Sequence, residues 1–158
     1  MMFPVTRVAP ETDQIAHAAS LLAAAQRPLI IMGDGIAASS AQAELAYVAR
    51  QLSTKVWGAK SAKTKMDTMH YKDTSRHASG EYGEMITSQA DVVLICGAYI
   101  FPEVFSARSC IFATDANIIH IDLNSYEVGK NFSPGHTNDP RTILARLAVA
   151  LDGIMAAT

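Results

Sequence analysis

The amino-acid sequence predicts a doubly wound α/β domain, Rossmann-like, with a mainly parallel sheet and helices on both faces of that sheet. The apolar blocks "LIIMG", Leu29–Gly33, and "DVVLICG", Asp91–Gly97, show no polar alternation, which is typical of strands buried on both faces. Helical patterns lie between such blocks, and this alternation indicates a parallel sheet joined by helical crossovers. Because such crossovers are right-handed, the sheet would be wound in both directions.

Each element is predicted from apolar periodicity and from its start and stop signals. The chain is predicted to begin with a helix over 11–26, a strand over 29–33, a helix capped by Ser39 or Ser40 that runs to Leu52, and a strand over 55–59. A polar loop over 60–79, a short helix over 80–89 and a strand over 91–97 follow. The last part is predicted as an irregular segment over 98–116, a strand over 117–123, a weak edge strand within 134–139 and a helix over 140–156. Thr12 or Asp13 is expected to cap the first helix. Asp139 is expected to cap the last one, with Pro140 at its first helical position.

Length and composition limit the classes of protein to consider. The chain has 158 residues, 49% hydrophobic and 18% charged, so we expect one folded domain over 1–158. The net charge is −2 and there is no basic run, which argues against a nucleic-acid partner or a membrane surface. No apolar run is long enough to span a membrane, and the start of the chain lacks a secretory pattern. Cys96 and Cys110 lack C-x-x-C spacing, which favours a reducing, cytoplasmic setting.

The stretch around Gly33-Asp34-Gly35 has three interpretations. Gly-Asp-Gly opens the metal motif of thiamine diphosphate enzymes, but the Asn that completes this motif is missing, because the first Asn after the stretch is Asn117. Gly33-x-Gly35-x-x-Ala38 also fits the dinucleotide fingerprint, in which a helix start holds a phosphate. The acid expected after the second strand is absent, however, and lysines stand there instead. The third interpretation is a tight strand-to-helix turn that needs glycine.

Five histidines raise the question of a metal site. His120 and Asp122 would share one face of a strand, because their spacing is two. No third ligand lies near them in the sequence, so we predict no metal site and expect a hydrogen-bonded histidine at a strand end. No nucleophile–base pair can be recognised either, which leaves little support for a small free-standing enzyme.

Three blocks of the sequence, in this order, resemble the central domain of thiamine-diphosphate-dependent enzymes, a family that includes acetohydroxyacid synthase, benzoylformate decarboxylase and oxalyl-CoA decarboxylase. They are "LLAAAQRPLIIMGDGIAASSAQAELAYVARQLSTKV", "HASGEYGEMITSQADVVLICGA" and "IIHIDLNSYEVGKNFSPGHTNDPRTILARL". The first looks like the family's R-P-hydrophobic-G-x-G strand and turn, and the last is similar to the "HIDID…EIGKN…D" segment of the synthases. The resemblance implies an FAD/NAD-binding-like fold over nearly the whole chain.

The resemblance also implies a division of labour. Full-length members have one catalytic domain before this domain and one after it, and these two domains bind thiamine diphosphate and magnesium. The chain alone is therefore expected to be inactive, a scaffold between the two catalytic domains of a parent decarboxylase or synthase, which would be its partners. A homo-oligomer is expected as well. The alternative is a free-standing regulatory module that binds a nucleotide.

In some members the central domain binds FAD or ADP. Carried over by resemblance, this nucleotide site falls on Gly33, Asp34, Gly35, Gly97, Asp122, Leu123, Glu127 and Asp139. The carboxylates of Asp122 and Glu127 could accept hydrogen bonds from ribose hydroxyls. The flavin end differs from the family, because Tyr99 replaces an Arg and Glu81-Tyr82 replaces a Met-His pair. These differences favour an ADP-like ligand, or an empty domain, over FAD.

Overall fold

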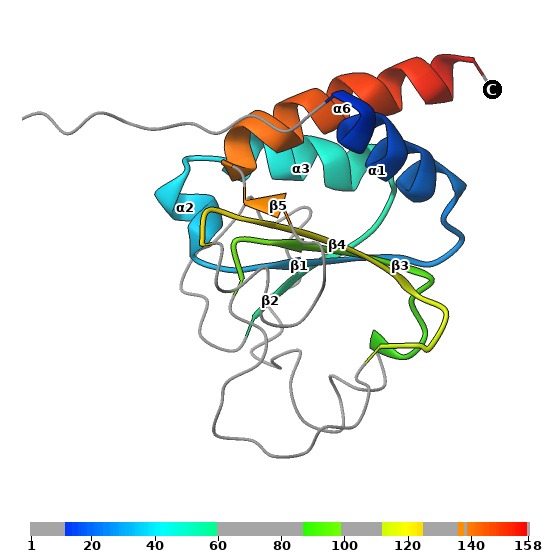
Figure 1. Ribbon diagram of the computed structural model, residues 1–158, viewed down its shortest axis with the longest axis horizontal. Coiled ribbons are helices and arrows are strands. Elements are labelled where there is room, and N and C mark those ends of the chain that lie inside the picture. The colour runs from blue at the N-terminus through cyan, green and yellow to red at the C-terminus, as the bar shows by residue number, and fades with distance from the viewer. Residues whose placement is uncertain (1–11, 60–86, 99–111, 125–135, 138, 158) are drawn as a thin grey trace, which may run out of the picture.

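The computed structural model of the chain describes residues 12–59, 87–98, 112–124, 136–137 and 139–157, which contain a five-stranded sheet. Its strands are β1 (Pro28–Met32), β2 (Val56–Gly58), β3 (Val92–Cys96), β4 (Asn117–Asp122) and β5 (His136–Thr137). The strand order is β2-β1-β3-β4-β5, and every neighbouring pair is parallel (Figure 1). The first strand, β1, lies inside the sheet. From β1 the chain runs to one edge at β2, and it then returns past β1 to β3, β4 and β5 at the other edge. The predicted doubly wound parallel sheet is therefore confirmed.

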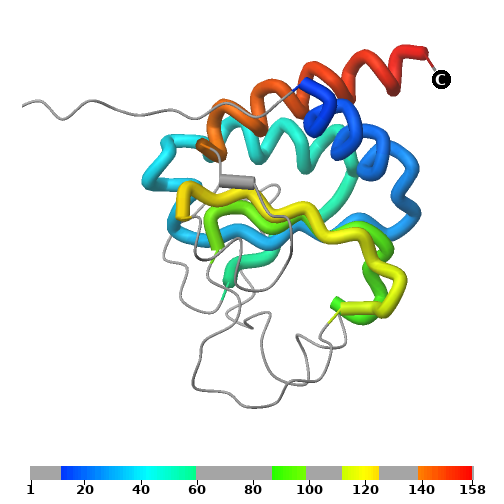
Figure 2. Tube along the Cα trace, in the orientation of Figure 1, coloured from blue at the N-terminus to red at the C-terminus, as the bar shows by residue number. Residues whose placement is uncertain are grey.

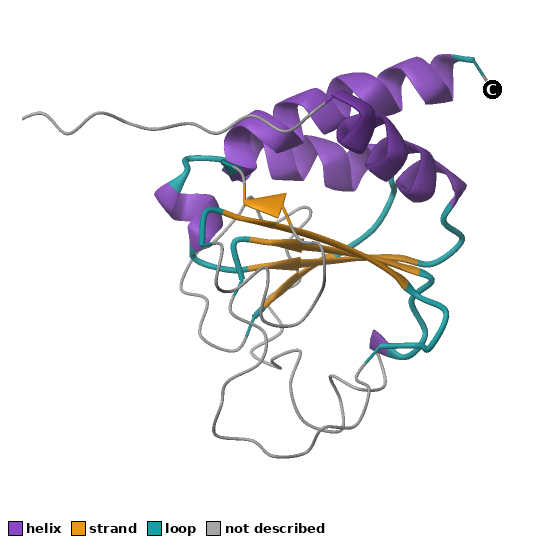
Figure 3. Cartoon of the chain, in the orientation of Figure 1, coloured by secondary structure: helices purple, strands orange, loops and turns teal. Residues whose placement is uncertain are grey.

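The helices of the described part are α1 (Thr12–Ala24), α2 (Gly35–Ala38), α3 (Gln42–Gln51) and α6 (Pro140–Ala156), and Thr87 ends a further helix. α1, α3 and α6 form a layer over one face of the sheet (Figure 3). The first and last of these helices pack side by side, so distant parts of the chain meet there (Figure 2). Most of the helix predicted over 80–89 lies outside the described residues.

The sheet separates two apolar clusters, which explains the strands without polar alternation. The helix-side cluster fills the space under α1, α3 and α6 and includes Leu22, Ile30, Met32, Leu45, Val48, Leu94, Leu144, Leu147 and Leu151. The far-side cluster covers the other face and includes Leu29, Ile31, Ala59, Val93, Ile95, Ala98 and Phe112, with Trp57 packed against it. None of the helices in the described ranges is both long and apolar enough to cross a membrane.

Two of the predicted helix starts can be compared directly with the structure. Asp139 is the N-cap of α6, its carboxylate accepts the Thr142 N–H at 3.0 Å, and Pro140 follows, so this prediction is confirmed. Thr12 and Asp13 are already helical residues of α1, so neither is its N-cap. The cap of that helix falls before residue 12, outside the described residues.

The predicted cap of the helix over 40–52 is wrong. α3 begins after Ala41, whose side chain cannot cap, and Ser39 and Ser40 instead follow α2. Ser40 has a φ of 53°, its N–H bonds to the Ala37 carbonyl at 3.0 Å, and the Ala41 N–H bonds to the Ile36 carbonyl at 2.9 Å. This is a Schellman ending, and it closes a helix. The extra turn forms because Ile36 and Ala41 are both buried in the helix-side cluster.

Candidate functional site

The carboxyl ends of β1, β3 and β4 lie at one edge of the sheet, close to α2 and the start of α6 (Figure 1). We refer to this region as the carboxyl edge and define it by Gly33–Gly35, Gly97-Ala98 and Asp122–Asn124. The strand order changes direction between β1 and β3. In open α/β sheets, ligands bind outside the carboxyl ends of the strands at such a switch point. The carboxyl edge is therefore the candidate site.

The three glycines of this edge pack directly on one another. A Cβ added to Gly33 would lie 2.2 Å from the Gly97 carbonyl oxygen, and one added to Gly35 would lie 2.6 Å from the Gly97 Cα. Gly97 itself has a φ of +56°, and a Cβ there would lie 2.7 Å from the Gly35 Cα. Only glycine allows this approach of two backbones, and only glycine adopts such a φ easily. The close contact alone is enough to require glycine at all three positions.

Backbone hydrogen bonds continue the sheet beyond its strands at this edge. The Gly33 N–H donates to the Cys96 carbonyl at 2.9 Å, and the Gly35 N–H donates to the Gly97 carbonyl at 3.0 Å. The Gly97 N–H donates in turn to the Ile121 carbonyl at 2.8 Å. The turn after β1, the end of β3 and the end of β4 therefore form one hydrogen-bonded unit.

The end of β4 presents a carboxylate at the same edge. Asp122 Oδ1 accepts the backbone N–H of Asn124 at 2.8 Å, which shapes the turn that leaves the strand. Leu123, between them, is 46% exposed. Since Ile121 faces the helix layer, Asp122 lies on the opposite face of the sheet.

Asp139 has a different position from the other predicted site residues. β5 pairs with the end of β4, so the chain leaves the carboxyl edge just before Asp139. Its side chain is 5% exposed, and its Oδ2 accepts from both the N–H and the hydroxyl of Thr142, at 3.0 and 2.7 Å. The structure thus gives Asp139 a capping role. Glu127, Tyr99 and the Glu81-Tyr82 pair lie outside the described residues.

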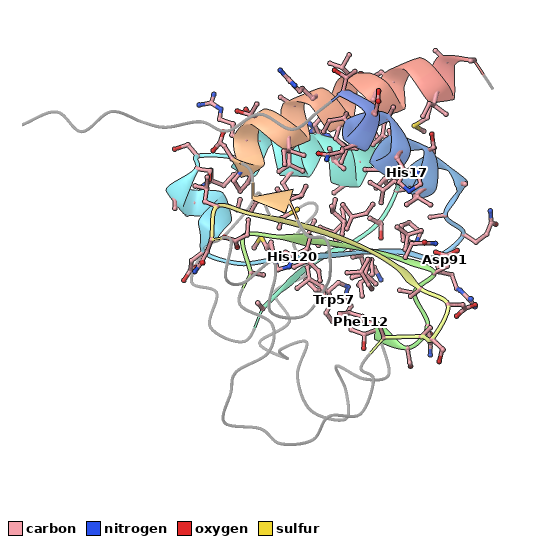
Figure 4. The ribbon with its side chains drawn as sticks, in the orientation of Figure 1. His17, Trp57, Asp91, Phe112 and His120 are labelled. Atoms are coloured by element: carbon pink, nitrogen blue, oxygen red, sulfur yellow. The ribbon has the colours of Figure 1, made fainter. Side chains whose placement is uncertain are left out.

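His120 lies on the far-side face of β4, the face away from the helix layer where Trp57 and Phe112 also lie (Figure 4). Burial lowers its pKa, while the Asp122 carboxylate and a hydrogen bond with the Ala98 backbone act in the opposite direction. Burial is the largest of these effects, so the pKa of His120 lies below its usual value. The ranges that the structure describes contain no group of three His, Cys, Asp or Glu side chains that could hold a metal ion.

One acidic residue was missed by the sequence analysis and lies at the opposite end of the strands. Asp91 Oδ2 accepts the Gln26 N–H at 2.7 Å, and its Oδ1 accepts the Arg27 N–H at 3.0 Å. Burial acts to raise the pKa of Asp91, but these bonds, with those from the Asp91 and Val92 N–H groups, lower it by more. The pKa therefore lies below its usual value. The only signal in the sequence was an acid directly before a buried strand.

Comparisons with known proteins agree with this fold. Residues 15–147 match the family model described as "Thiamine pyrophosphate enzyme, central domain". A probable acetolactate synthase large subunit of Methanococcus aeolicus is 30% identical over 148 residues, which are 90% of this chain and 24% of that protein. An acetolactate synthase of Mycobacterium leprae is 27% identical over 123 residues, which are 77% of this chain and 20% of that protein.

Solved structures give the same picture at lower sequence identity. Benzoylformate decarboxylase from Polynucleobacter necessarius superposes with a TM-score of 0.76 at 18% identity, covering 96% of this chain and 29% of that one. The 4-hydroxybenzoylformate decarboxylase of Rhodococcus jostii gives 0.73 at 21% identity, covering 93% and 29%. The chain spans only about a fifth to a quarter of the length of the curated relatives it matches, 24% in the Methanococcus protein and 20% in the Mycobacterium leprae protein. The resemblance inferred from the three sequence blocks is confirmed.

Proposed function

The chain belongs to the central-domain family of thiamine pyrophosphate enzymes, and we propose that it is the non-catalytic central domain of a 2-keto-acid decarboxylase or synthase-type enzyme. The match over residues 15–147 carries this proposal. In it, thiamine diphosphate and magnesium belong to the catalytic domains of the parent enzyme, and those domains are the partners of this one. A cytoplasmic location and a homo-oligomeric state are part of the same proposal.

The chemistry of the described side chains supports a non-catalytic role. Cys96 is fully buried, and burial, together with the Asp122 carboxylate, raises the pKa of its thiol, so it is not a nucleophile at neutral pH. The carboxylates of Asp122 and Asp139 accept hydrogen bonds from backbone N–H groups, where they shape a turn and cap a helix. These roles are structural, and they leave the reaction chemistry to other domains.

Contacts within the helix layer support a role as a scaffold. Arg141 Nε lies 2.9 Å from Glu44 Oε1, which joins the start of α6 to the start of α3. Further along, the Tyr47 hydroxyl donates to Asp152 at 3.1 Å, and Gln51 Nε2 donates to the same carboxylate at 2.7 Å. Each exposed contact is worth little by itself. Together with the apolar core beneath them, these contacts fix how α3 and α6 are aligned along each other. A fixed arrangement of the helix layer is what a scaffold domain requires.

A weak, ADP-like nucleotide site at the carboxyl edge is the finer part of the proposal. Asp122 offers a carboxylate at a strand end, where such groups accept hydrogen bonds from ribose hydroxyls. Gly97 and Leu123 adjoin it, and we include Glu127 on the basis of the family pattern. A free-standing nucleotide-binding regulatory module remains the second candidate, favoured by the same edge. The replacement of the family's flavin contacts by Tyr99 and the Glu81-Tyr82 pair in the sequence supports a nucleoside ligand over a flavin.

The test is to assay the purified chain with several 2-keto acids, thiamine diphosphate and magnesium. We expect no decarboxylation or carboligation above buffer, because the proposal places both cofactors in other domains. Turnover that rises in proportion to the concentration of highly purified chain would overturn the non-catalytic role. Sedimentation at high concentration tests the oligomer separately, and a strict monomer would count against it.

A further inference from the structure

We draw no further inference here: the strongest candidate, the outer surface of the helix layer where Tyr47 of α3 and Val149 and Met155 of α6 are exposed, carries none, because nothing in the described part of the structure shows what covers it.

Discussion

Asp91 Oδ2 accepts a hydrogen bond from the Gln26 backbone N–H at 2.7 Å, across 65 positions of the sequence. This contact ties the start of β3 to the turn between α1 and β1, and the Arg27 N–H adds a second bond to the other carboxylate oxygen at 3.0 Å. One side chain thus satisfies two backbone donors that follow the end of a helix. The turn that feeds the first strand into the sheet depends on this carboxylate.

We predict that Asp91→Asn lowers the free energy of unfolding by about 1 kcal/mol at pH 7, because an amide has one oxygen acceptor where the carboxylate has two. The folded-state pKa of Asp91 is depressed, so its stabilisation is present above the unfolded value of about 3.9 and is lost as the pH falls through the folded value. The difference between the two proteins should therefore shrink below about pH 4. Urea denaturation of both proteins at pH 7, 5 and 3 measures this difference in the free energy of unfolding. A difference that is the same at all three pH values would contradict the stabilising role of the Asp91 carboxylate.

Gly97→Ala should be among the most damaging single substitutions in the chain. It would force a side chain into a φ of +56° and place a Cβ 2.7 Å from the Gly35 Cα. We expect a loss of about 3 kcal/mol or more in the free energy of unfolding. Gly153→Ala is the control, because a Cβ there meets nothing within 4 Å, and it should stabilise α6 by about 0.5–1 kcal/mol. Thermal melts of both variants give the comparison, and equal effects would refute the glycine contact.

Ser53→Gly should stabilise the protein. Ser53 has a φ of 49° at the end of α3, where its N–H bonds to the Arg50 carbonyl at 3.0 Å and the Thr54 N–H bonds to the Ala49 carbonyl at 3.1 Å. This is a Schellman ending with serine in the left-handed position that glycine prefers. Relief of that strain should add about 0.5–1 kcal/mol to the free energy of unfolding. Ser53→Ala keeps the strain and should not stabilise, and chemical denaturation of the pair distinguishes them.

The purified chain should be colourless and should bind FAD weakly. In the family pattern an Arg helps to hold the flavin, and Tyr99 stands at that position. The loss of one charge-assisted hydrogen bond typically costs about 1.5–3 kcal/mol, or roughly a tenfold to hundredfold loss of affinity. Titration with FAD, ADP and NAD under the same conditions measures the order of affinities. A yellow protein as isolated would show that Tyr99 and Tyr82 belong to a different flavin site.

Properties carried by neighbouring residues were predictable from the sequence. The four longer strands were placed within one residue of their observed bounds, because blocks such as the one over 92–96 are buried on both faces. Asp139 was predicted as a cap because the cap, the proline and the bonded N–H all lie within 4 positions. Local chemistry was sufficient in both cases.

Properties that depend on distant residues were not predictable in this way. Ser39 and Ser40 carry the signal of a helix start, yet burial of Ile36 and Ala41 makes them the end of a short helix. The candidate edge was recognised through the family pattern. The interlocked backbones of Gly35 and Gly97 nevertheless appear only in the structure, because no local pattern shows which backbones will touch.

The packing of α1 beside α6 has a consequence for the order in which the molecule is made. The apolar face of α1, with Ile15, Ala19 and Leu22, is covered in large part by the last helix of the domain. During synthesis the first helix leaves the ribosome long before that cover exists. The helix-side cluster can close only when Leu144, Leu147 and Leu151 have been made. Folding of this domain is therefore governed by contacts of high sequence separation, and its nascent chain carries exposed apolar surface until synthesis of α6 is complete.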